Sequence, residues 1–245
     1  KALANAGATA NRSCGLHVHV GITNAQKKFS NDEILTIVKR YSEHQDAINT
    51  FLARSRTVTE GRSANGFCVP VDRVVTGLEG VKAQQGESRF AALGIDTIAR
   101  YGQHYDRVSV SSLNKYGTIE FRQHHGTVNG SKITNWIRFL LTHVEISRHL
   151  VAAAKRQAET LSGAPTKKIK KDTVFTGLPT KVRKHFKKQA NRLGKREAER
   201  AARVEARRAE RAAAREARQA ERARAEADPE EEDEIVPATP RPVRF

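Results

Sequence analysis

Two short stretches of the chain alternate apolar and polar residues, and this alternation constrains the fold more than any other feature. They read CGLHVHVGI at residues 14–22 and GTIEFRQHH at residues 117–125. Successive residues of a strand point to opposite faces of a sheet, so each stretch predicts a strand with one apolar and one polar face. YDRVSVSSL at residues 105–113 alternates in the same way, and the NKYG that follows predicts a turn and an antiparallel hairpin.

Two helices are predicted to cover the apolar faces of these strands. Residues 30–54 start with Ser30 or Asn31 as N-cap, carry acids in the first turn and repeat apolar residues at helical spacing. Residues 131–156 show the same spacing. Residues 55–104 have weak periodicity and many turn residues, which predicts surface loops. We therefore expect an α+β fold with an open antiparallel sheet backed by helices.

The character of the chain changes after residue 157. We expect a folded domain over residues 1–156, a basic linker with a short helix over 157–193 and an Ala-, Arg- and Glu-rich charged helix over 194–227. Residues 228–245, first acidic and then Pro-containing, are expected to be disordered. The charged helix has only one large aliphatic residue, Val204, which argues against a coiled coil.

The charge and composition of the chain limit the kinds of partner that it can have. The net charge is +17, and residues 151–245 hold 25 of the 44 Lys and Arg residues. This basic tail favours a polyanion such as nucleic acid, and a solvated arm that binds nothing is the alternative. Two cysteines make no disulfide framework, which favours a reducing, cytoplasmic setting. No apolar run approaches the roughly 20 residues that cross a bilayer, so we expect no membrane partner.

The polar faces of the strands carry residues with a common chemistry, namely His17 and His19 on one strand and Thr118, Glu120, Arg122 and His124 on the other. Imidazole and carboxylate bind divalent cations, and the planar fork of Arg binds phosphate or carboxylate. Such a surface suits phosphoryl transfer to a carboxylate, followed by attack of an amine on the acyl phosphate. Taken singly, His-x-His and Glu-x-Arg are also typical of a solvated strand face or a cross-strand ion pair.

SCGLHVHVG, followed by GTIEFRQHHGTV and a Trp-containing apolar helix, resembles the amidoligase family of glutamine synthetase-like carboxylate–amine ligases. The resemblance covers about residues 10–150. It implies a glutamine synthetase-like catalytic domain that uses ATP and Mg²⁺ or Mn²⁺ to form an amide or isopeptide bond. Carboxylate and amine substrates, peptides and proteins among them, would be its partners.

The resemblance also implies a role for each matching residue. His17 and Glu120 would be metal ligands, and His19 would contact nucleotide phosphate. Arg122 would hold the transferring phosphate or the substrate carboxylate. Two further catalytic candidates are Arg107, on the neighbouring strand, and Arg56, in a segment that resembles the loop arginine of the family.

Arg56 is equally typical of a solvated loop charge, and we expect structural or exposed roles for His124 and His125. Members of the family begin with a strand that carries paired acids, whereas residues 1–12 contain no acid. A hard cation prefers several oxygen ligands, so we expect the chain, which has no Met and starts with Lys1, to be an inactive or weakly active fragment.

Two other functions stay open at this point. The basic tail suits a nucleic-acid-associated or virion structural protein whose ligase-like domain is a relic. Alternatively, His17 and His19 could bind zinc in a hydrolase, although the chain has no His-Glu-x-x-His motif to supply further ligands.

Overall fold

The computed structural model describes residues 2–11, 13–22, 28–59, 62–63, 66, 68–159 and 172–227. The chain divides into two compact units, Lys1–Lys195 and Arg196–Phe245. Among the described residues, no helix combines the length and the apolar character that a membrane span requires.

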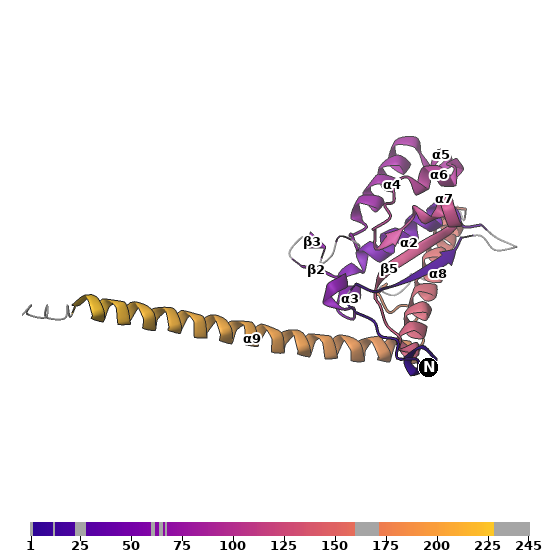
Figure 1. Ribbon diagram of the computed structural model, residues 1–245. Helices are drawn as coiled ribbons and strands as arrows, with labels where there is room; N and C mark the ends of the chain where they lie inside the picture. The colour runs from indigo at the N-terminus through magenta and orange to yellow at the C-terminus, as the bar shows by residue number, and fades with distance from the viewer. Residues whose placement is uncertain are drawn as a thin grey trace, which may run out of the picture. The chain divides into compact units, whose positions relative to one another are not determined.

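An open, three-stranded antiparallel sheet forms the core of the first unit (Figure 1). The strand order is β1 (Gly15–Gly21), β5 (Thr118–His125) and β4 (Val108–Ser109). The α+β fold and the strands predicted over residues 14–22 and 117–125 are confirmed, whereas the strand predicted over residues 105–113 is limited to two residues. The expected tight turn between β4 and β5 is instead a short helix, α7 (Ser112–Tyr116), which ends at a glycine with φ 62°. A separate two-stranded sheet pairs β2 (Val58–Thr59) with β3 (Arg62–Ser63).

The helix expected over residues 30–54 is divided in two. α2 (Asn31–Glu43) begins with a capping box, in which Ser30 and Glu33 each satisfy a backbone N–H of the other. The chain turns at His44 and continues as α3 (Gln45–Asn49).

α2 and α8 (Gly130–Glu159) lie on the apolar face of the sheet (Figure 1). The ring of Phe121 on β5 lies 5.7 Å from the ring of Tyr41 on α2 and 6.4 Å from the ring of His143 on α8. Trp136 of α8 is fully buried nearby. The helix predicted over residues 131–156 is therefore confirmed, and it backs the sheet as expected. A short helix, α1 (Ala2–Asn5), lies near the start of the chain.

The prediction of loops over residues 55–104 is wrong for most of this stretch. After the short helix η1 (Arg54–Arg56) and β2–β3, the chain forms α4 (Asp72–Gln85), α5 (Glu87–Ala92) and α6 (Ile95–Ala99). These helices bury few residues each, chiefly Val74, Leu78, Phe90 and Ile98. So few buried positions give no clear helical period in the sequence.

A bulge in β5 reverses the alternation of that strand. Leu16 pairs with His124 and Val18 pairs with Phe121, so an interval of two residues in β1 faces an interval of three in β5. Residues directly opposite each other share a face of the sheet, so His124 lies on the apolar face with Leu16. It is 1% exposed, and its ring lies 5.2 Å from that of Trp136. The prediction that His124 shares the polar face is therefore wrong.

The segment from residue 172 to 195 packs on the first unit through an apolar stripe. Val174, Leu178, Val182 and Phe186 are buried, and the ring of Phe186 lies 4.7 Å from that of Phe51. The compact unit thus extends beyond residue 156, the end of the domain expected from sequence, because part of the basic stretch contributes to the core.

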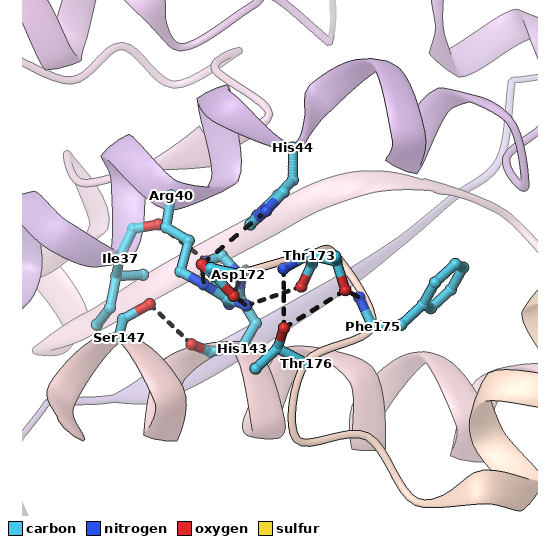
Figure 2. A network of polar contacts seen from close by, with 9 residues as sticks. All are labelled: Ile37, Arg40, His44, His143, Ser147, Asp172, Thr173, Phe175 and Thr176. Atoms are coloured by element: carbon cyan, nitrogen blue, oxygen red, sulfur yellow. Dashed lines mark hydrogen bonds and ion pairs between the residues drawn. The ribbon is translucent and has the colours of Figure 1, made fainter. Parts of the chain in front are cut away.

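A buried polar network fixes the start of this segment (Figure 2). Arg40, 3% exposed, donates from Nε and Nη2 to the two carboxylate oxygens of Asp172, at 2.7 and 2.9 Å. Its Nη1 lies 2.9 Å from Nδ1 of His143, whose Nε2 lies 2.9 Å from the carbonyl oxygen of Ile37. Because a carbonyl only accepts, Nε2 carries the proton and Nδ1 accepts from Arg40. Burial and the charge of Arg40 lower the pKa of His143 to about 3, which keeps the ring neutral.

α9 (Thr180–Ala227) contains both helices predicted for the tail. Its first part belongs to the first compact unit, and the residues from Arg196 onward belong to the second. The acidic and Pro-containing end predicted over residues 228–245 lies outside the described residues.

Candidate active site

Glu120 is the centre of a cluster on the open face of the sheet. It lies on the central strand with His19 as its direct partner on β1. Its Oε1 lies 3.0 Å from Nδ1 of His17, 3.6 Å from Nε2 of His19 and 2.7 Å from Nη1 of Arg122. The structure therefore brings together the four residues that alternation placed on one face. The imidazoles are more than a third exposed, whereas the carboxylate is nearly buried.

The surroundings of Glu120 keep it ionised. Burial alone would raise the pKa of this carboxyl, but the hydrogen bond from His17 and the charges of Arg122, His17 and His19 outweigh burial and lower the pKa to about 2. A carboxylate with so low a pKa is a poor proton acceptor at neutral pH. It is suited to orient imidazoles or to attract a cation.

Two hydroxyl groups position this cluster. Ser112, in α7, donates from Oγ to Oε2 of Glu120 at 3.2 Å. Thr118 Oγ1 lies 2.8 Å from Nδ1 of His19, which orients that imidazole with Nε2 toward the carboxylate. Thr118 could be anticipated, because alternation places it on the face of Glu120. Ser112 could not, because its position depends on the helix that replaces the expected turn.

Arg56 approaches the cluster across Gly15. A Cβ atom on residue 15 would lie 2.8 Å from Nε2 of His17 and 3.1 Å from Nη2 of Arg56, so both side chains occupy the space above this glycine. Arg56 is 3% exposed and donates from Nη2 to the carbonyl oxygen of Cys14 at 2.8 Å. It is therefore a buried charge rather than a solvated one.

Arg107 lies directly before β4 and is fully buried. Its Nε donates to the carbonyl oxygen of Cys68 at 3.1 Å. Burial raises the pKa of the Cys68 thiol, and the charges of Arg107, Arg56 and Arg122 act in the opposite direction. The charges of the three arginines proposed from sequence thus all act on one buried residue.

Each of these arginines has a buried guanidinium nitrogen without a hydrogen-bond partner among the described residues. They are Nη1 and Nη2 of Arg107, Nε of Arg122 and Nε of Arg56. An unsatisfied buried donor costs about 1–3 kcal/mol. An anion that accepts hydrogen bonds from them would remove this cost, so the arrangement suits a phosphate or a carboxylate.

The same surroundings fit a metal ion less well. The described residues contain no group of three or more His, Cys, Asp or Glu side chains placed to hold a metal. The imidazole of His17 and the guanidinium of Arg122 already contact the Oε1 atom of Glu120. Since Mg²⁺ prefers several oxygen ligands, these residues do not complete a site for it, and metal binding by His17 and Glu120 stays a prediction.

A family model described as "Putative amidoligase enzyme" matches residues 1–144. The chain belongs to this amidoligase family. The match includes all the site residues described above, and this family indicates a ligase-type enzyme. The amidoligase match ends before segment 172–195, which packs on the domain, and before the rest of α9. No curated protein and no solved structure matches the chain.

Proposed function

We propose that this amidoligase is an ATP-dependent ligase that joins a carboxylate to an amine through an acyl phosphate. The observation that carries the proposal is the set of buried guanidinium groups with free donors beside an ionised Glu120. Membership of the amidoligase family supports the ligase class.

The arginines are the groups that would hold the reacting anions. Arg107 has two free donors on one buried guanidinium, which suits two oxygens of one phosphoryl or carboxylate group. Arg122 is fixed by its ion pair with Glu120, so its remaining donors keep a defined direction. Positive charge held in a buried site stabilises the charge that develops on a phosphoryl group during transfer.

In this proposal, ligation takes place in two steps. A carboxylate oxygen of the acid attacks the γ-phosphorus of ATP, the bond from that phosphorus to the bridging oxygen breaks, and ADP leaves. The amine nitrogen then attacks the acyl carbon, the bond between that carbon and the phosphate oxygen breaks, and phosphate leaves. The nitrogen loses a proton to give the amide.

His17 and His19 are the groups beside Glu120 that can exchange protons or contact phosphate oxygens, since both are more than a third exposed. In this proposal His19 contacts nucleotide phosphate. Magnesium would accompany the nucleotide, but no step is assigned to it because the described residues do not complete its site.

The test is ADP release by the intact protein with ATP, Mg²⁺ and a panel of carboxylates and amines. We expect ADP to form only when a carboxylate is present, in equal amount to the amide detected by mass spectrometry. Hydroxylamine in place of the amine should trap the acyl phosphate as a hydroxamate. ADP formation that does not depend on the carboxylate would contradict the proposal.

Matched variants assign the activity to the site. Glu120→Gln and His17→Ala should each lower ADP release at least about tenfold, because they remove the charge or the ring at the centre of the cluster. Glu79→Gln is the control, since Glu79 is a partly exposed residue of α4 that pairs with Lys39. Unchanged turnover in the two site variants would exclude the proposed site.

A further inference from the structure

The first part of α9, Thr180 to Lys195, has two opposite faces of different chemistry. Val182, Phe186 and Gln189 are buried against the domain. The other side of the helix is exposed and carries only basic charges, namely those of Lys181, Arg183, Lys184, Lys187, Lys188, Arg192 and Lys195. We call this set the basic face.

The sequence around the basic face offers an acidic partner only at its end, where Glu199 follows Lys195 by four residues. Residues 173–196 contain no Asp or Glu. Asp172, just before this stretch, already accepts hydrogen bonds from Nε and Nη2 of Arg40. The positive field also reaches neighbouring groups. Burial, together with the charges of Lys132, Arg56 and Arg192, lowers the pKa of His125 to about 4.

The second part of α9 differs, although it is rich in arginine. Residues 196–227 hold ten Arg and seven Glu. Several of these are spaced for pairing along the helix, as Glu199 is with Arg203 and Glu205 with Arg208. Within α9, uncompensated positive charge is therefore concentrated on the basic face.

Five of the cations form a row along the helix. Lys181, Lys184, Lys188, Arg192 and Lys195 fall within an arc of about 80° at 100° per residue. With a rise of 1.5 Å per residue they follow one another at about 4.5–6 Å over about 21 Å. One strand of duplex DNA presents a phosphate about every 3.4 Å of axis, so each long side chain of the row can reach a phosphate.

We propose that the basic face of residues 180–195 binds the phosphate backbone of nucleic acid, independently of sequence. No aromatic or large aliphatic side chain is exposed on this face. A membrane-binding helix needs such residues to enter the bilayer, and protein interfaces use them as central anchors. Phosphate neutralisation requires cations alone, which is what the face provides.

The test is the fluorescence anisotropy of a labelled DNA duplex titrated with the full chain at several salt concentrations. If the five cations of the row contact phosphates, log Kd should change with log salt with a slope of about 4.5, which is a loss of affinity of about 500-fold between about 50 and 200 mM salt. Replacing Lys184, Lys188 and Arg192 by Gln should reduce the slope to about 1.8, a loss of about 12-fold over the same range.

A control variant separates this face from net charge. Replacing Arg203, Arg207 and Arg211 by Gln removes an equal number of positive charges, three, from the second part of α9. This variant should leave the affinity and the slope nearly unchanged. Equal losses in the two triple variants, or no binding at low salt, would overturn the proposal. So would equally tight binding of polyglutamate of the same charge, or of phosphatidylserine vesicles, because either would identify a different class of partner.

Discussion

Arg107 and Arg40 are both buried, yet their removal should change stability in opposite directions. In Arg107→Met the chain loses one hydrogen bond from a charged donor to the carbonyl of Cys68, worth about 1.5–3 kcal/mol. It also loses two unsatisfied donors, which cost about 1–3 kcal/mol each, and a methionine fills similar space. We expect the free protein to gain about 2 kcal/mol of unfolding free energy.

Arg40→Met is the matched control. All three guanidinium nitrogens of Arg40 have partners, in Asp172, His143 and the carbonyl of Thr173. Removing one member of a buried ion pair leaves its partner uncompensated and costs about 3–5 kcal/mol. The two variants make the same chemical change, so the difference in their stability reports how far the partners of each guanidinium satisfy it.

Urea unfolding followed by the fluorescence of the single tryptophan, Trp136, measures both effects. Phosphate or ATP at about 100 times its Kd should stabilise the wild type by about 2.7 kcal/mol and should stabilise Arg107→Met much less. The reasoning fails if Arg107→Met is destabilised as much as Arg40→Met, or if the anion stabilises the wild type and Arg107→Met equally.

Three further changes test other parts of the structure. Because the pKa of Glu120 is lower in the folded than in the unfolded chain, its charge contributes about 3 kcal/mol above about pH 5, and this is lost as the pH falls toward 2. The difference in urea stability between wild type and Glu120→Gln should therefore shrink between pH 7 and pH 3, and a constant difference would contradict the assignment. Gly15→Ala should displace His17 and lower ligase turnover while changing the urea midpoint little, whereas a loss of folding would show that the glycine is structural. Asp172→Asn should cost about 3 kcal/mol in the same unfolding assay, because it leaves Arg40 buried without its anion, and unchanged stability would mean that segment 172–195 is held by its apolar contacts alone.

Much of the site could be predicted from the alternation of apolar and polar residues in the strands. The two-residue period placed His17, His19, Glu120 and Arg122 on one face, and pairing of β1 with β5 brought them together. Register depends on which face can be buried, so the apolar residues on the reverse side determined this result. Arg107 and Arg56 were named from the family resemblance, but only the fold revealed their burial and their free donors.

Other features of the fold leave no pattern in the local sequence from which they could be predicted. The short helices α4 to α6 each bury too few residues for periodicity to emerge. The burial of segment 172–195 depends on contacts such as Phe186 with Phe51, which are distant in sequence, while its local composition is basic. Ser112 reaches Glu120 because α7 replaces a turn, and a helix of five residues is not specified by sequence pattern.

The bulge in β5 shifts by one residue the alternation that decides which face of the sheet each side chain occupies. Before it, even-numbered residues such as Glu120 and Arg122 face the open side, and after it the even-numbered His124 faces the core. Deleting Gln123 would remove the bulge and restore one uninterrupted frame, in which His124 directly follows Arg122 and stays opposite Leu16 on the core face, and every residue of the Glu-x-Arg motif would remain. A comparison of chains that scores only the motif would miss this change, so the number of residues between Arg122 and Trp136 carries information that their identities do not.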